Sequence, residues 1–286
     1  MTMPDRRLNA YRPDLADERL RGQVQAHAFT SGQPNQVCVA VADVRRNPSP
    51  DAPVDTQAIF GETVQVFEDH EGWCWVQMDS DGYVGYMAHN ALTSKIATAT
   101  HSVSVPRTFL YPGPDMKFPV TSALSIGSRL SVVGEVETRG TDYLLLGSGE
   151  AIIAAHARRV NDHFDDPVAV AARLIDTPYL WGGRTAFGID CSGLVQLSHA
   201  ICGNALQRDS DMLRAEAGEL IGEGADHPPL RRGDLVFWKG HVAMMEDETM
   251  MLHASGHTMN VVREPFTEAI ARIGHLYGLP LAYRRP

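Results

Sequence analysis

Long hydrophobic runs are missing from this chain of 286 residues. No apolar stretch approaches the roughly 18 residues that a membrane-spanning helix needs, so we expect no membrane partner. The N-terminal sequence is polar and arginine-rich, and it lacks the apolar middle of a secretory signal peptide. We therefore expect the protein to be cytoplasmic.

Positive charge is also scarce, because 25 lysines and arginines stand against 35 aspartates and glutamates, for a formal net charge of −10. Binding to nucleic acid or to an anionic membrane depends on clustered lysine and arginine, which this chain does not show. The same charge disfavours adhesion to an anionic cell wall. The sequence thus predicts no nucleic acid partner and no membrane partner.

Cysteine is rare as well, and the four cysteines form neither a disulfide framework nor a metal-ligand spacing. Cys38 lies in the apolar run VCVAVADV and Cys74 stands between two tryptophans, and both patterns are typical of β-strands. Reduced thiols agree with a cytosolic enzyme. We expect no metal ion and no other cofactor.

The length of the chain is sufficient for two or three domains. Residues 1–31 form a polar leader, in which we expect a short helix around Leu15 to Val24. Short alternating segments with turns between them follow in residues 32–95 (VCVAVADV, TVQVFE, WCWVQM, YVGYMA) and in residues 96–160 (SVSVPRTFLY, RLSVVGEV, DYLLLG). Each set predicts a small β-barrel, the second more diverged than the first.

Residues 161–286 mix helix and strand patterns. DPVAVAARLI predicts a helix that begins just after Asp166. DLVFW, HVAMME, MMLHAS and NVVRE predict a series of strands, with glycine, aspartate and asparagine between them. Helices packed against such a sheet give the fold class α+β.

Cys191 lies where a glycine-rich loop meets a helix, in the segment YLWGGRTAFGIDCSGLVQ. Gly182, Gly183 and Gly188 allow this loop positive φ angles and close approach to other chain segments. Asp190 has a side chain that caps helix N-termini. A thiol at this position faces unpaired N–H groups and the positive end of the helix dipole, which favour the nucleophilic thiolate. The alternative, a small buried core cysteine, agrees less well with these neighbours.

Two of the 12 histidines are placed to serve this cysteine. His241 begins HVAMME and His253 lies in MMLHAS, and both are equally far from Asp247 in the turn between them. A hairpin centred on Asp247 places the two imidazoles directly opposite each other on one face of the sheet. Three further histidines of this region are expected to be structural or solvated: His199, His257 and His275.

The cysteine segment resembles the nucleophile segment of the NlpC family of papain-like cysteine peptidases, which cleave bacterial cell-wall peptides. The family's PYxWGG loop and the following G-[ILV]-DCSG are matched from Pro178 to Gly193. The resemblance implies a papain-like α+β domain in which the helix bearing Cys191 packs on an antiparallel sheet. In such a domain the GHV[AG] histidine, here His241, is the general base, and the histidine of the LHAS-like strand, here His253, orients it.

The resemblance extends to the rest of the chain. Residues 32–95 resemble the bacterial SH3-like domain that precedes such catalytic domains, and residues 96–160 resemble a second copy. This arrangement is similar to that of a dipeptidyl-peptidase group that hydrolyses the γ-D-glutamyl–diamino acid bond of peptidoglycan stem peptides with a free N-terminal L-Ala. It implies a cysteine peptidase of cell-wall peptide recycling whose partner is this stem peptide.

The same resemblance implies the residues that contact the substrate. The free amine is held by Asp190 and Ser192 on either side of the cysteine, and by Glu62 and Tyr83 of the first barrel. Tyr86 is the alternative to Tyr83. An ammonium group in a partly closed cleft needs carboxylate partners to offset its desolvation. The backbone N–H of the cysteine and the hydroxyl of the loop tyrosine, Tyr179, would stabilise the oxyanion.

Two other classes of function stay open. A non-catalytic protein could bind wall peptides through its SH3-like barrels, and an amidase or acyltransferase could use the same triad on another acyl donor. The complete set of Cys191, His241 and His253 favours an enzyme over a binding protein. The sequence leaves open which diamino acid is preferred, what the second barrel and the leader do, and whether the protein is oligomeric.

Overall fold

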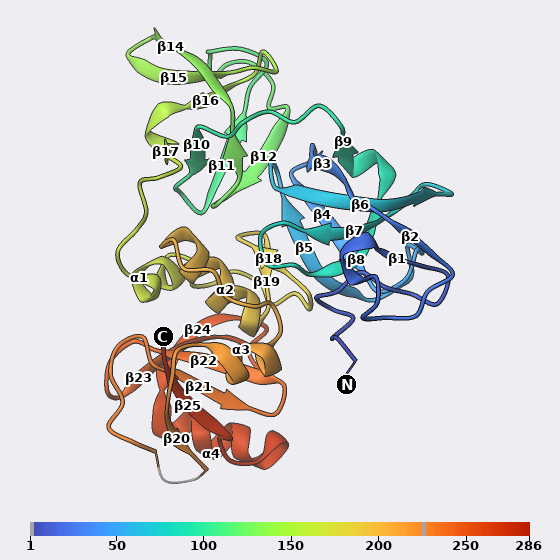
Figure 1. The fold of residues 1–286 in the computed structure, drawn as a ribbon. Coiled ribbons are helices and arrows are strands. Elements are labelled where there is room, and N and C mark those ends of the chain that lie inside the picture. Colours follow the sequence, from blue (N-terminus) through green and yellow to red (C-terminus); the bar gives the residue numbers. More distant parts are fainter. Residues whose placement is uncertain (1–2, 225–226) are drawn as a thin grey trace. The chain divides into compact units, whose positions relative to one another are not determined.

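Figure 1 shows the computed structural model of the protein, which describes residues 3–224 and 227–286. The chain forms two units, Met1–Asp162 and His163–Pro286. The first consists almost wholly of β-strands, and the second combines helices with an antiparallel sheet. No helix in the described ranges is long and apolar enough to span a bilayer.

Strands and short 3-10 helices make up the first unit. In chain order they are β1 (Leu15–Asp17), η1 (Glu18–Leu20), β2 (Ala28–Thr30), β3 (Gln33–Val37), β4 (Val41–Arg45), β5 (Val54–Ile59), β6 (Thr63–His70), β7 (Trp73–Met78), β8 (Val84–Ala88), η2 (His89–Ala91), β9 (Leu92–Thr93), β10 (His101–Val103), β11 (Arg107–Leu110), β12 (Ser122–Ser125), β13 (Arg129–Leu130), β14 (Val132–Thr138), β15 (Thr141–Leu146), β16 (Ala151–Ile153), η3 (Ala154–His156) and β17 (Ala157–Arg159).

Seven of these strands form one sheet in the order β5-β4-β8-β7-β6-β3-β9. The predicted strands TVQVFE, WCWVQM and YVGYMA are confirmed as β6, β7 and β8. The prediction that VCVAVADV forms one strand is wrong, because β3 ends at Val37 and β4 begins at Val41. β3 and β4 are not neighbours in the sheet, so the chain must bend between them, and Cys38 is exposed in that bend.

The helix predicted around Leu15 to Val24 is also wrong. Residues 15–17 form β1, which pairs in parallel with β2, and only Glu18–Leu20 form a short 3-10 helix. Leu20 and Val24 have helical spacing and share one apolar cluster, but the chain turns between them at Gly22, whose φ is 83°. Glycine adopts this left-handed conformation without steric cost.

The N-terminal residues pack on the seven-stranded sheet. The guanidinium of Arg12 lies 4.3 Å from the ring centre of Trp75, and it donates to Glu68 at 2.8 Å and to the hydroxyl of Tyr86 at 2.9 Å. The N–H of Val84 donates to the backbone carbonyl of Arg7 at 2.8 Å. Tyr86, the alternative amine-binding tyrosine, is therefore engaged by an arginine of the same unit.

Three smaller sheets follow in the first unit, in the orders β13-β10-β17, β11-β12 and β14-β15-β16. They share one apolar cluster formed by Val103, Leu110, Leu124, Leu130, Leu144, Leu146 and Ile152. Phe60 packs against this cluster, and its carbonyl accepts the N–H of Arg129 at 2.8 Å. The predicted strand DYLLLG is confirmed as part of β15, whereas SVSVPRTFLY divides into β10 and β11 and RLSVVGEV into β13 and β14. That these strands form a second SH3-like barrel stays a prediction.

The second unit contains the longer helices and one large sheet. Its elements are α1 (Pro167–Ala172), β18 (Arg184–Thr185), β19 (Gly188–Ile189), α2 (Cys191–Ile201), α3 (Ser210–Glu216), β20 (Glu219–Glu223), β21 (Leu235–Trp238), β22 (His241–Met245), β23 (Met250–Ser255), β24 (Asn260–Pro265), α4 (Phe266–Tyr277) and β25 (Ala282–Arg285).

The six-stranded sheet of this unit has the order β20-β25-β21-β22-β23-β24, and every neighbouring pair is antiparallel. Helix α4 buries Phe266, Ala269 and Ile273 in one apolar cluster with side chains of β21, β22 and β23. Helix α2 lies beside α1 (Figure 1) and contacts β22 and β23. The central strands therefore place their side chains within reach of α2.

Candidate active site

Cys191 is the first residue of α2, as the sequence predicts. The Oδ1 atom of Asp190 accepts the N–H of Gly193 at 2.7 Å, so Asp190 caps the helix. Such a cap satisfies one of the N–H groups that lack a partner within the first turn. Residues Cys191 to His199 are all buried. Burial and the cap hold the sulfur at a fixed position.

Glycines let the preceding loop pack against the first turn of α2. Gly182 has a φ of 74°, and its N–H donates to the Oδ2 atom of Asp190 at 2.9 Å. A Cβ atom added at Gly193 would lie 2.3 Å from the carbonyl oxygen of Gly183. No side chain fits at that separation, so the glycines of this motif are required by the contact between loop and helix.

Arg208 pairs with Asp190 through both carboxylate oxygens. Its Nη2 atom donates to Oδ2 at 2.7 Å and its Nη1 atom to Oδ1 at 3.0 Å, while Nη1 also donates to the Oγ atom of Ser192 at 2.8 Å. The Arg208 side chain is 1% exposed. The charge of Asp190 is thus balanced inside the protein, and its role toward a substrate amine stays a prediction, as does that of Ser192. Arg208 was not predicted, because it follows α2 without a local signal.

His241 opens β22 next to the cysteine. The sulfur of Cys191 accepts the backbone N–H of Val242, which brings the start of β22 to the N-terminus of α2. The Nε2 atom of His241 lies 2.8 Å from the Nδ1 atom of His253. The remaining nitrogen of His241, Nδ1, is therefore the one available to the thiol. The structure brings the three predicted catalytic residues together.

The hairpin of β22 and β23 is not centred where the sequence predicts. The side chain of Asp247 accepts the N–H groups of both Thr249 and Met250, at 2.7 and 2.8 Å, so the turn closes one residue later. His241 and His253 are consequently diagonal neighbours on one face, and not directly opposite. Diagonal neighbours are still within reach of long side chains. The paired residues are Met244 with Leu252 and Met245 with Met251.

Glu264 extends this line of polar contacts. Its Oε1 atom lies 2.8 Å from the Nε2 atom of His253, and the same oxygen forms an ion pair with Arg272 of α4. Burial acts to raise the pKa of Glu264, but His253 and Arg272 outweigh it and lower the pKa below its ordinary value. Glu264 is therefore ionised at neutral pH. Neither Glu264 nor Arg272 was predicted, because a glutamate near the end of a strand is usually solvated.

The N-terminus of α2 acts on the thiol as predicted, because the N–H of Ser192 lowers the pKa of Cys191, but burial outweighs it. Burial raises the pKa of Cys191 to about 12, and the charge of Asp190 acts in the same direction. The N–H of Val242 opposes this rise without cancelling it. Burial also lowers the pKa of His241 to about 3, with His253 adding to the effect. At neutral pH the thiol and the imidazole are both uncharged.

Tyr179 is partly buried within electrostatic range of the sulfur. Burial raises the pKa of Tyr179, and the charge of Cys191 is the next cause. The N–H of Tyr179 donates to the carbonyl of Met259 at 2.8 Å, which ties the loop to the turn between β23 and β24. The hydroxyl stays protonated at neutral pH and can donate a hydrogen bond. Its role in stabilising an oxyanion stays a prediction.

The other histidines of this unit divide by burial. His199 in α2 is 4% exposed, and burial lowers its pKa to about 4. It is structural and neutral, because a protonated imidazole would have no water around it. His257 and His275 are exposed, in agreement with the prediction that they are solvated.

Glu62 and Tyr83, the other predicted amine-binding residues, lie in the first unit. Glu62 is 4% exposed, and its Oε2 atom accepts the N–H of Ile59 at 2.9 Å. Tyr83 is 3% exposed and belongs to the apolar core of the seven-stranded sheet. Both side chains are therefore buried and held by contacts within that unit. Their contact with a substrate stays a prediction.

Comparison with known proteins assigns both parts of the chain. Residues 44–92 match the family model described as the bacterial dipeptidyl-peptidase Sh3 domain, and residues 176–272 match the NlpC/P60 family. Dipeptidyl-peptidase 6 of Lysinibacillus sphaericus is 28% identical over 85% of this chain and 100% of its own length. A γ-D-glutamyl-L-lysine dipeptidyl-peptidase of Bacillus cereus is 28% identical over 70% of this chain and 67% of its own length.

Two further similarities concern the catalytic unit and the fold. The probable endopeptidase NlpC of Escherichia coli is 32% identical over 33% of this chain and 68% of its own length. A crystal structure of an NlpC/P60 family protein from Bacillus cereus superposes with a TM-score of 0.73 at 23% identity, covering 88% of this chain and 99% of that one. The latter supports the papain-like fold.

The family match spans the segment that carries Cys191, His241, His253 and Glu264. A cysteine whose sulfur accepts the N–H next to His241, with further polar groups behind that imidazole, agrees with the arrangement of a nucleophile and its base. The chain belongs to the NlpC/P60 family: it is a hydrolase with a papain-like catalytic domain and an SH3 domain of the bacterial dipeptidyl-peptidase type.

Proposed function

We propose that the protein is a cysteine peptidase that hydrolyses the γ-D-glutamyl–diamino acid bond of peptidoglycan stem peptides with a free N-terminal L-Ala. The observation that carries this proposal is the line of contacts from His241 through His253 to Glu264, together with the N–H of Val242, next to His241, that donates to the sulfur of Cys191. The names of two relatives, both dipeptidyl-peptidases, support the substrate class.

The contacts behind His241 determine which of its nitrogens carries the proton. A carboxylate accepts hydrogen bonds and cannot donate, so Glu264 requires a proton on the Nε2 atom of His253. The Nδ1 atom of His253 is then an acceptor, and the N–H of His241 Nε2 donates a hydrogen bond to it at 2.8 Å. The Nδ1 atom of His241 is left with a free lone pair, which we assign to the thiol proton of Cys191. This is the tautomer that a general base needs.

The proposed reaction begins when substrate displaces water from the site. The Nδ1 atom of His241 takes the thiol proton as the sulfur of Cys191 attacks the side-chain carbonyl carbon of the γ-D-glutamyl residue. The oxyanion of the tetrahedral intermediate accepts the N–H of Cys191 and the hydroxyl of Tyr179. His241 then protonates the departing amine of the diamino acid, and a water molecule activated by His241 hydrolyses the thioester.

Because the thiol and imidazole are both neutral in the resting site, the proton moves only when the developing charges are stabilised. Imidazolium formation is stabilised by the Glu264 carboxylate through His253, in the manner of the third member of a catalytic triad. Arg272 keeps Glu264 ionised without entering the reaction. The four residues thus form one proton-transfer system in which only Cys191 and His241 exchange a proton.

We propose further that a free amine at the N-terminus of the substrate is recognised by Ser192 and Asp190 beside the nucleophile and by Glu62 and Tyr83 of the SH3 domain. Arg208 already balances Asp190, so the carboxylate of Glu62 has the larger share in offsetting the ammonium. Acetylating the amine then costs on the order of 3–5 kcal/mol, which is about a hundredfold or more in kcat/KM.

The test uses L-Ala-γ-D-Glu peptides that end in L-Lys or meso-diaminopimelate, each with a free or an acetylated amine. The expected product is the dipeptide L-Ala-D-Glu, identified by mass spectrometry, and Cys191→Ala should yield none. Glu62→Gln should slow the free-amine peptide and narrow its advantage over the acetylated one. Absence of cleavage of every peptide, with binding retained, would identify a binding protein; transfer of the acyl group to another amine would identify an acyltransferase.

We propose that the substrate is a released peptide, processed in the cytoplasm during recycling of the cell wall. The scarcity of positive charge supports this, because an acidic protein is repelled by an anionic wall. Purified sacculi offer the contrasting substrate. Solubilisation of intact sacculi at a rate comparable to hydrolysis of the free peptide would contradict the proposal.

A further inference from the structure

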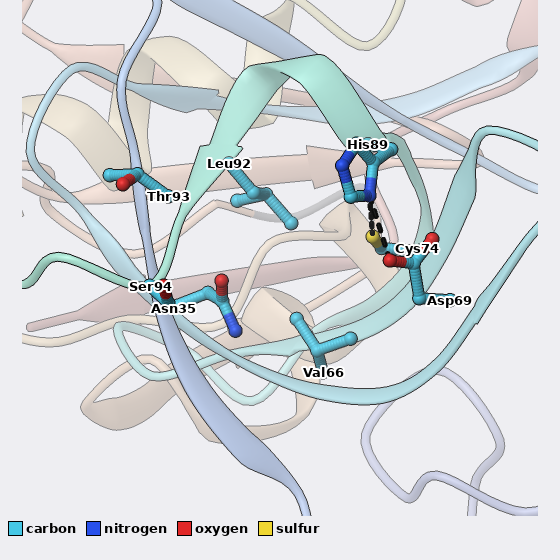
Figure 2. A pocket seen from close by; sticks show the side chains of 8 residues that line it. All are labelled: Asn35, Val66, Asp69, Cys74, His89, Leu92, Thr93 and Ser94. Carbon is cyan, nitrogen blue, oxygen red and sulfur yellow. Dashed lines mark hydrogen bonds and ion pairs between the residues drawn. The ribbon is translucent and has the colours of Figure 1, made fainter.

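Three side chains with metal-binding atoms converge at one end of the seven-stranded sheet (Figure 2). The Nδ1 atom of His89 lies 2.8 Å from Oδ2 of Asp69 and 3.9 Å from Sγ of Cys74, and all three atoms lie within 4.8 Å of one another. Among the residues that the structure describes, this is the one such group of three. Its residues belong to the first unit, whereas Cys191, His241 and His253 belong to the second.

Backbone pairing in the sheet brings these three side chains together. Asp69 of β6 and Cys74 of β7 are direct partners in the antiparallel ladder, so their side chains lie on the same face. His89 begins η2 immediately after β8, and its N–H donates to the carbonyl of Gly72 in the β6–β7 turn at 2.8 Å. Two paired strands and a hydrogen-bonded helix start therefore supply the three donors. Sites held on such rigid elements keep their geometry better than sites on free loops.

A cavity gives access to the same three atoms. Its volume is about 390 Å³. Figure 2 shows that the three donor side chains lie at one end of its lining. The residues that line it are Asn35, Val66, Asp69, Cys74, His89, Leu92, Thr93 and Ser94. Cys74 is 3% exposed, whereas the side chains of Asp69 and His89 are 50% and 62% exposed. A small ion can reach the sulfur from the side of the two exposed groups.

The combination of donors selects the ion. Mg²⁺ and Ca²⁺ are bound almost wholly by oxygen, so a sulfur donor excludes them. Zn²⁺ is bound by thiolate, imidazole and carboxylate in a tetrahedral arrangement, and three protein ligands leave its fourth position open. We propose that Asp69, Cys74 and His89 form a Zn²⁺ site whose fourth position faces the cavity. Binding releases the thiol proton to solvent, and the open position takes water or an anionic group.

The competing explanation is that the Asp69–His89 ion pair merely covers a core cysteine. Equilibrium dialysis of the full-length Cys191→Ala protein against Zn²⁺ separates the two, since this background removes the catalytic thiol as a rival ligand. The expected result is one Zn²⁺ per chain. Replacing Zn²⁺ with Co²⁺ should add a thiolate-to-metal band in the near ultraviolet and visible bands of tetrahedral Co²⁺.

The variants locate the site. His89→Ala and Cys74→Ala should each weaken Zn²⁺ binding by about a hundredfold or more, since even outer partners of metal ligands cost 10–100-fold. Cys38→Ser is the matched thiol control, because Cys38 is an exposed cysteine of the same sheet region. His70→Ala is the matched imidazole control, because the side chain of His70 is 74% exposed beside Asp69. Both controls should bind Zn²⁺ as the parent does.

His89→Ala keeps the experiment decisive if removal of the buried thiol of Cys74 impairs folding, because His89 is largely exposed. Its thermal midpoint in chelator should equal that of the parent, and only the rise of the midpoint on adding Zn²⁺ should be lost. Substoichiometric uptake by the parent, or unchanged uptake by His89→Ala, overturns the proposal. Neither result would bear on the catalytic roles of Cys191, His241 and His253, which belong to the second unit.

Discussion

The Nε2 atom of His241 lies 2.8 Å from the Nδ1 atom of His253 although the two residues are diagonal, and not direct, neighbours in the β22–β23 ladder. This single contact links the nucleophile side of the site to Glu264 and Arg272 on its far side. The consequences of that link can be measured one residue at a time.

Glu264→Gln should lower kcat by about tenfold to a hundredfold and leave KM nearly unchanged. The amide can donate a hydrogen bond to His253 Nε2, which favours the wrong tautomers of both imidazoles. Steady-state kinetics on the free-amine peptide measure the effect. Glu268→Gln, at an exposed position of α4, is the matched control. Equal kcat in the two variants would exclude Glu264 as a positioning residue.

His253→Ala should reduce kcat/KM by about a hundredfold or more, whereas His253→Asn should retain most of the activity within about tenfold. The amide oxygen of asparagine can accept the proton of His241 Nε2, which a methyl group cannot. Cys191→Ala and His241→Ala should each abolish turnover. A larger loss of kcat/KM in His253→Ala than in His253→Asn would support the orienting role of His253. Equal losses in the two variants would mean that His253 acts through packing alone.

The resting enzyme should contain no thiolate at pH 7, because burial raises the pKa of Cys191 to about 12. The difference in absorbance near 240 nm between the wild type and Cys191→Ala measures thiolate directly. Alkylation of Cys191 by iodoacetamide should likewise be slower than that of exposed Cys38. One equivalent of thiolate at neutral pH would contradict this, because it would show that Cys191 and His241 form a thiolate–imidazolium pair in the resting enzyme.

The acid limb of kcat/KM should lie well below pH 6.5, because burial lowers the pKa of His241 to about 3. A base with a lowered pKa stays unprotonated, and so competent, until the pH falls close to that value. We expect kcat/KM to be flat between about pH 5 and 8. A pH profile with half the activity lost near pH 6.5 would contradict the burial of this imidazole.

His199 should make the second unit sensitive to acid. Its pKa is about 4 in the folded protein against an ordinary value of 6.5, so the unfolded chain binds the proton more tightly. The free energy of unfolding then decreases as the pH falls from 6.5 towards 4, by up to about 1.4 kcal/mol per pH unit. The free energy of unfolding, measured in urea at pH 7 and at pH 4.5, should differ less between the two pH values for His199→Leu than for the wild type. His275→Leu, at an exposed position, should leave the difference unchanged.

Local features of the site could be predicted from the sequence. Asp190 followed by an apolar helical pattern places the start of α2 at Cys191, since a cap and a periodic apolar face act within a few residues. The segments TVQVFE and WCWVQM form β6 and β7 as predicted, although β7 buries Cys74, Trp75 and Val76 in succession. Glycine beside Cys191 indicates close approach because no other residue fits.

Predictions from residue spacing alone were wrong where a turn or a side-chain hydrogen bond determined the conformation. Leu20 and Val24 have the spacing of a helix, but Gly22 turns the chain between them. The His241–His253 register moved because the side chain of Asp247 closes its own turn. Periodicity reports which residues are apolar, and it does not report which hydrogen bond a turn will form.

The sequence by itself determined that Cys191 begins a helix, and it predicted the nucleophile and the pair of histidines, because these rest on patterns in consecutive residues. Only the tertiary structure decided that Glu264 stands behind His253 and that Arg208 balances Asp190. It also decided that burial keeps the thiol of Cys191 neutral. The charge state of a buried group depends on which side chains exclude water and supply partners, and those come from segments far apart in the chain.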